Sequence, residues 1–192
     1  MIGDANKGRL SVPAGAGDQA TTAATGERAY QQARAAAIYY LSLKKSSSGQ
    51  VSRYLVRKGW PAPVADVVSQ ALVKDGYIND IVLAQQVLKG RCGRKAESFA
   101  HLEQRLRRLG FPPAVRAQAL DAYRLEGQSD LKLLAALLKS KYAAELRLLR
   151  DKQLPPERCR ELHLLLLSRA AGRGFTPALL RQLLNLWGLT LE

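Results

Sequence analysis

A short pattern occurs three times in this chain: a helix-forming stretch ends at a Gly followed by an aromatic residue, and a second apolar stretch starts within three residues. The copies centre on Gly59-Trp60, Gly110-Phe111 and Gly174-Phe175. In each copy the residues eight and four before the Gly are apolar, and so is the residue five after it. Such agreement in phase indicates an internal repeat. The Gly residues are spaced 51 and then 64 apart, so the third unit carries an insertion.

The apolar periodicity predicts helices throughout, because no run of alternating apolar and polar residues is long enough for a strand. Ser47 with Gln50 has the capping-box form and predicts a helix from there to Lys58. In the third unit, one leucine-rich helix is expected to run from Ser129 to the break at Pro155. The expected organisation is a flexible tail (1–29), repeat 1 (30–78), repeat 2 (79–126) and repeat 3 with its insertion (127–192).

Each repeat should contain three helices and is too small to bury its apolar faces alone. Stacking is therefore expected, and the fold class is predicted as all-α, an elongated and curved array of three tandem three-helix repeats. Trp60, Phe111 and Phe175 occupy equivalent positions, which predicts that they form part of the core of each repeat, at the corner between two helices.

The 192-residue chain has a net charge of +14, and the charges of residues 1–29 cancel, so the excess belongs to the repeats. A surplus of this size indicates a polyanionic partner, although a basic protein without such a partner remains an alternative. No apolar run approaches the roughly 20 residues of a membrane span, and the two Cys residues do not make a disulfide framework. A cytoplasmic protein without a membrane partner is expected.

Basic residues gather in groups that share helix faces or adjoin one another. If the repeats stack in register, these groups form a positive stripe that binds phosphates; the alternative is a set of solvated charges. The candidate binding residues are Arg53, Arg57 and Lys58 in repeat 1, Arg94, Lys95, Arg105, Arg107 and Arg108 in repeat 2, and Lys139 and Lys141 in repeat 3.

Catalytic and metal-binding patterns are not apparent in the sequence. His101 and His163 are the only histidines, and Cys159 with His163 supplies two ligands where a zinc site needs at least three from the protein. No phosphate-binding glycine loop or nucleophile elbow occurs. The sequence therefore predicts a binding protein with no catalytic residue, cofactor or metal.

Several segments together resemble the RecX family of regulatory proteins, which modulate the bacterial RecA recombinase. These segments are Tyr40-Leu41-Ser42, Leu55 to Trp60, Ala71 to Asp80 with Ala84, and Leu102 to Phe111. The resemblance implies an all-helical array of three-helix repeats. It also implies a regulator that binds the RecA–DNA filament and inhibits its growth, ATP hydrolysis and strand exchange in recombination, DNA repair and the SOS response. A monomer is expected.

Direct DNA binding is the main rival function, because two helices joined by a tight turn also describe a helix-turn-helix. Such a module could contact single- or double-stranded DNA through its phosphates. The second helix of each predicted pair begins with Pro and mainly apolar residues, which do not read base edges. The rival is therefore a phosphate-directed module, and an enzyme is a more distant alternative.

Overall fold

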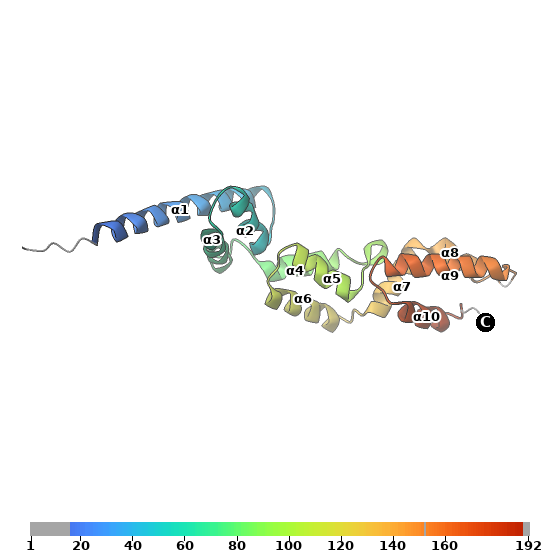
Figure 1. Ribbon diagram of the computed structural model, residues 1–192. Helices are drawn as coiled ribbons and strands as arrows, with labels where there is room; N and C mark the ends of the chain where they lie inside the picture. The colour runs from blue at the N-terminus through green and yellow to red at the C-terminus, as the bar shows by residue number, and fades with distance from the viewer. Residues whose placement is uncertain (1–15, 152, 190–192) are drawn as a thin grey trace, which may run out of the picture.

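The computed structural model describes residues 16–151 and 153–189, and this part of the chain contains α-helices, one short 3₁₀ helix and no strand. The helices follow one another along an elongated body (Figure 1). The predicted all-helical, elongated fold is thereby confirmed. The elements are α1 (Ala16–Leu43), α2 (Ser48–Arg57), α3 (Ala62–Lys74), α4 (Asp80–Lys89), η1 (Gly93–Lys95), α5 (Phe99–Arg108), α6 (Pro113–Leu125), α7 (Asp130–Lys141), α8 (Ala143–Leu148), α9 (Pro156–Ala171) and α10 (Pro177–Leu186).

Helix α1 begins earlier than the sequence analysis predicts. The expected flexible tail extends to residue 29, whereas α1 starts at Ala16; residues 1–15 lie outside the described part. The C-terminal half of α1 is anchored by the buried Ala33 and Ala37. Once a packed segment has formed a helix, each further residue adds a hydrogen bond at low cost, and Ala has the highest helix propensity. The alanine-rich stretch therefore continues the helix, and the N-terminal half of α1 projects beyond α2 and α3 (Figure 1).

The third predicted repeat also differs in one place from the expectation. The leucine-rich segment forms two helices, because α7 ends at Lys141 and α8 starts after Tyr142, whose φ and ψ are −120° and 32°. Tyr142 and Leu146 both lie in the same core as Leu138. Burial of these side chains favours the change of direction, and tertiary packing here outweighs the helix propensity of the segment.

Three equivalent corners join the second and third helices of the predicted repeats. Gly59, Gly110 and Gly174 have φ values of 98°, 81° and 83°, a region that side chains with a Cβ rarely adopt. The aromatic residue after each Gly donates its backbone N–H to the carbonyl five residues earlier, at 3.2, 3.2 and 3.1 Å. Phe111 and Phe175 are buried, and Trp60 is half-buried against its core. The local geometry therefore repeats where the sequence pattern repeats.

Two joints connect the units through the N-termini of α2 and α5. The Asp80 carboxylate at the start of α4 accepts hydrogen bonds from the backbone N–H (3.0 Å) and the hydroxyl (2.5 Å) of Ser48. At the next joint, Asp130 at the start of α7 accepts from the N–H of Phe99 at 2.7 Å. A carboxylate at a helix N-terminus satisfies free N–H groups and complements the helix dipole. Each of these helix starts is thus fixed by the first helix of the following unit.

The hydrophobic interior is divided into two cores. One core belongs to α1, α2 and α3, with Leu55 and Leu72 among its fully buried side chains. The other is continuous from α4 to α10 and includes Leu106, Leu137 and Leu166. The joint between α1–α3 and the rest of the array is therefore held mainly by polar contacts, whereas the second joint shares a hydrophobic core.

Candidate polyanion-binding surface

Exposed basic side chains cluster at the C-terminal ends of α2 and α5. Arg57 and Lys58 precede the first corner, and Arg107 and Arg108 precede the second; all four are exposed. Cations in a last helical turn interact favourably with the helix dipole, so their positions cost the fold little. None of these four is in an ion pair within the described part of the chain. Their charges are therefore available to a partner.

Arg53 links the α2 group to the α5 group. Its guanidinium donates one hydrogen bond to the carbonyl of Gly49 and another to the carbonyl of Arg108, both at 3.1 Å. Basic residues that are about 50 positions apart in the sequence thus meet at the first joint. The side chain of Arg53 is exposed, and carbonyl partners leave its positive charge unneutralised.

Lys44 and Lys45 add to this surface, although they are not among the candidates that the sequence pattern predicts. They line a hollow of about 360 Å³ together with Leu109 and Phe111 of the second corner. Both lysines are exposed. Their proximity to the second corner depends on the hydrogen bond from the Ser47 hydroxyl to the Leu109 carbonyl at 2.5 Å, which no local pattern reveals. In the sequence, the only indication that Lys44 and Lys45 belong to the basic surface is their place shortly before the helix cap at Ser47.

A second basic group forms where η1 packs along α7. Arg94 and Lys95 of η1 and Lys139 and Lys141 of α7 are exposed, and Gly93 lies close to the Ser140 hydroxyl between the two lysines. Candidates from the second and third predicted repeats are therefore neighbours in space. The ammonium groups of Lys139 and Lys141 lie 5.4 Å from the ring centres of Trp187 and Tyr142, a distance typical of cation–π contacts.

Arg105 has a different place from the one that helical spacing predicts. Its guanidinium binds the buried Glu97 carboxylate through two hydrogen bonds of 2.9 and 2.5 Å. Arg91 and Arg173 also approach the same carboxylate, each at 3.8 Å. Arg105 is therefore a part of the scaffold at the second joint and does not belong to the free group of Arg107 and Arg108.

The electrostatic environment of Glu97 explains how a buried carboxylate remains charged. Burial by itself would raise the pKa of the Glu97 carboxyl. The hydrogen bonds from Arg105 and the positive charges of Arg105, Arg91 and Arg173 outweigh burial and hold the pKa below its usual value. The Arg105 guanidinium has a raised pKa, chiefly because it donates hydrogen bonds to Glu97. The group is thus a fixed ion cluster at neutral pH.

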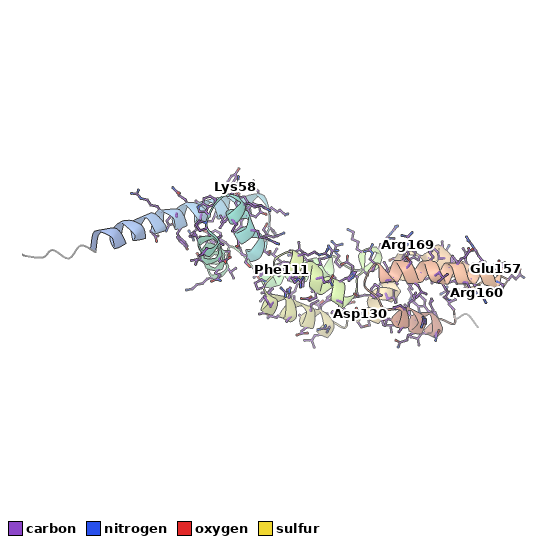
Figure 2. The ribbon with its side chains drawn as sticks, in the orientation of Figure 1. Lys58, Phe111, Asp130, Glu157, Arg160 and Arg169 are labelled. Atoms are coloured by element: carbon purple, nitrogen blue, oxygen red, sulfur yellow. The ribbon has the colours of Figure 1, made fainter. Side chains whose placement is uncertain are left out.

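The basic side chains lie along one elongated body. Lys58 and Arg169 are both on the upper edge of the molecule in Figure 2, on the side of α2, α5 and α9. Helices α3, α6 and α10 lie along the lower edge in Figure 1. Helices α2 and α5 both end in basic last turns, and α9 carries Arg169 in its last turn. This arrangement can contact phosphates at several points along an extended polyanion.

No group of three or more His, Cys, Asp or Glu side chains in residues 16–151 and 153–189 is placed to hold a metal ion. His163 and Cys159 lie on α9, where the His163 ring nitrogens face the carbonyls of Cys159 (2.8 Å) and Leu189 (3.0 Å). His163 is thus engaged by backbone groups. None of the helices in this part of the chain is both long and apolar enough to cross a membrane.

Comparisons with known proteins give the same family name from sequence and from structure. No family model matches the chain. The regulatory protein RecX of Geobacillus kaustophilus (strain HTA426) is 30% identical over 102 residues, and that of Geobacillus thermodenitrificans (strain NG80-2) is 28% identical over 102 residues. Each match covers 53% of this chain and 36% of the relative, so the similarity spans about a third of the length of these curated proteins.

Two solved structures share the fold. A crystal structure of regulatory protein RecX has a TM-score of 0.61 at 15% identity, and the similarity covers 88% of this chain and 77% of that one. RecX from Lactobacillus salivarius has a TM-score of 0.60 at 13% identity, covering 85% of this chain and 99% of that one. Together with the sequence matches, these similarities confirm the resemblance to the RecX family that the sequence motifs indicate.

Proposed function

We propose that this chain is a RecX-type regulatory protein that binds the RecA filament on DNA and restrains its growth, ATP hydrolysis and strand exchange. One observation carries the proposal: α2 and α5, in successive units of an elongated helical body, end in exposed cations that have no ion-pair partner among the described residues. A filament on DNA is a long and periodic partner with phosphates along its length. An extended protein with cations at several points can contact more than one repeat of such a partner at once.

The proposed mechanism needs binding but no bond-making. A bound elongated body occupies the surface on which neighbouring subunits must move or be added, and it thereby slows growth and turnover. The cap at the N-terminus of α5 and the core shared across the second joint keep the last two units in a defined relative position. Pre-organisation of this kind reduces the entropy lost on binding. The phosphate contacts supply affinity and attract the protein to the filament over a distance.

The first test is the DNA-dependent ATP hydrolysis of purified RecA at increasing amounts of this protein. We expect inhibition at amounts well below one protein per RecA subunit, because a regulator that blocks growth acts on many subunits through one site. Bovine serum albumin at the same concentrations controls for non-specific effects. Unchanged hydrolysis at equimolar protein would contradict the proposal.

A second test concerns the salt dependence of filament binding. Replacing Arg57, Lys58, Arg107 and Arg108 by Ala is expected to weaken binding and to reduce the slope of log affinity against log salt concentration. Each lost phosphate contact changes this slope by roughly 0.7 on single-stranded DNA, so the four substitutions lower it by up to about 3. The measurement is filament binding between 50 and about 200 mM salt.

The matched control for the charge test uses arginines that have acidic partners. Arg124 pairs with Asp121 at 2.7 Å, and Arg158 pairs with Glu161. Replacing these two arginines by Ala removes surface charge without removing a free cation, so the slope should stay close to that of the unchanged protein. If the fourfold variant also retained its slope, the surface at α2 and α5 would be only a solvated face.

Phosphate contact with DNA alone is the second candidate function, and the same exposed cations favour it. The first turns of α3, α6 and α10 contain Pro and apolar residues, so base-specific reading by these helices is not expected. Binding to DNA without RecA should therefore be weak and independent of sequence. Tight binding to one duplex sequence, with no effect on RecA, would favour the DNA-binding alternative.

A further inference from the structure

A groove of about 640 Å³ opens at the first joint, between α2 and α3 on one side and the starts of α4 and α6 on the other. Gly49 and Gly110, which approach each other closely, both line the groove, and the lining residues Gln70 and Gly76 are exposed. Pockets of this volume accommodate small ligands or a few side chains. The groove is distinct from the hollow that contains Lys44 and Lys45, because the two use different residues of the first turn of α2.

The charges of this groove are opposite in sign to those of the protein as a whole. Within the described part of a chain of net charge +14, its charged lining residues are Asp66 and Asp80 and include no Lys or Arg. Both carboxylate oxygens of Asp80 are occupied by Ser48. Asp66 is exposed, and its carboxylate accepts one hydrogen bond, from the Ser52 hydroxyl at 2.7 Å. The Asp66 carboxylate is therefore the free negative charge of the lining, and the Arg53 guanidinium lies beside Gly49 and Gly110.

The remaining lining is largely apolar or small. Val73 on α3 is 39% exposed, and Ile81 and Val115 are half-buried across from it. Asp66, Gln70 and Val73 are spaced four and three residues apart, so they form one stripe along α3. A helix face of this kind, beside a groove, is suited to an amphipathic peptide segment. Such a segment would offer apolar side chains to Val73 and Ile81 and a cation to Asp66.

We infer that this groove is the protein-binding site of the molecule and takes an apolar segment with one Lys or Arg from a RecA subunit of the filament. The inference rests on the proposed function and deepens it. The cationic surface contacts DNA phosphates, whereas the carboxylate-marked groove contacts protein. Charge complementarity selects this occupant, because a phosphate or an acidic peptide would meet Asp66 as a like charge.

The test uses a charge reversal that should strengthen binding at the cationic surface and weaken binding at the groove. Asp66→Lys makes the protein more basic, so contacts with phosphates should become stronger, while contact of the groove with a cationic segment should become weaker. We expect affinity for RecA filaments on a single-stranded oligonucleotide to fall by roughly tenfold or more, since like charges in an interface are strongly unfavourable. Affinity for the same oligonucleotide without RecA should stay equal or increase.

The matched control is Asp121→Lys, which changes the net charge equally at an exposed position of α6 outside the groove. It should bind filaments at least as tightly as the unchanged protein. Asp66→Asn retains an oxygen that can accept from Ser52 and should cause a smaller loss of filament affinity; urea unfolding curves check that each variant is folded. Equal filament affinity of Asp66→Lys and Asp121→Lys would overturn the groove assignment, whereas absence of filament binding by the unchanged protein would instead overturn the proposed function.

Discussion

Replacing Gly174 by Ala is expected to lower the free energy of unfolding of the C-terminal core, the one formed by α4 to α10, by about 3 kcal/mol. The backbone φ of 83° costs an Ala residue about 1 to 2 kcal/mol. In addition, a Cβ at this position would overlap the Ser98 hydroxyl and the ring of His101, at the start of α5. Overpacking typically adds about 1 to 3 kcal/mol. The loss should appear in urea denaturation followed by the fluorescence of Trp187, which packs on this core.

The matched control for this substitution is Gly59→Ala. Gly59 has the same type of backbone conformation, with a φ of 98°, but a Cβ there would meet nothing within 4 Å. The free energy of unfolding of the α1–α3 core should then fall only by the backbone cost of about 1 kcal/mol. The fluorescence of Trp60, which packs on that core, follows its unfolding. Similar losses at the two positions would show that the second joint does not constrain the corner at Gly174.

The same comparison shows why the corners were predictable and the joints were not. Gly59, Gly110 and Gly174 end helices through local hydrogen bonds, so the chemistry that defines each corner lies within a few consecutive residues. The capping box of Ser47 and Gln50 is likewise local, and its prediction is confirmed. The contacts of Gly110 with Gly49 and of Gly174 with Ser98 connect residues more than 60 positions apart. They follow from stacking, which a single sequence does not specify.

The candidate binding residues show the same division between local and long-range information. Helical spacing places Arg105 and Arg108 on one face with Arg107 beside them, and the structure has Arg107 and Arg108 exposed at the end of α5. Arg105 is grouped with them because spacing alone does not distinguish a cation that faces solvent from one that faces a buried carboxylate. Glu97 precedes Arg105 by eight residues and lies before the Ser98 cap, outside the helix, so no periodic pattern connects the two. The three-dimensional path of the loop brings them together.

The division into two cores has a consequence for how the proposed function works. Units joined mainly by polar contacts reorient more easily than units that share a hydrophobic interior, because fewer apolar contacts are lost. The first joint is of the former kind, and it carries both the carboxylate-marked groove and the lysine-lined hollow. A partner that fills the groove would therefore also fix the angle between α1–α3 and the rest of the array.

Replacing Glu97 by Gln is expected to destabilise the C-terminal core by about 2 kcal/mol at neutral pH. The substitution keeps the side-chain shape but leaves Arg91, Arg105 and Arg173 close together without their shared anion. Removal of one partner from a fully buried pair costs about 3 to 5 kcal/mol. The three arginine side chains are 27 to 32% exposed, so solvent screening reduces that figure. Urea denaturation followed by Trp187 fluorescence measures the loss.

The pH dependence of this loss distinguishes an ionic role of Glu97 from a packing role. Because the folded-state pKa of Glu97 is lowered, its ionic contribution is fully present above the unfolded pKa and declines as the pH falls through the folded pKa. The stability difference between the unchanged protein and Glu97→Gln should therefore be constant above about pH 5 and shrink below about pH 4. Glu103→Gln is the matched control, since Glu103 is 43% exposed and pairs only with Arg116 among the described residues, at 3.1 Å; it should cost under about 1 kcal/mol. A Glu97→Gln difference that stayed constant through the acid range would mean that shape, and not charge, gives Glu97 its role at the second joint.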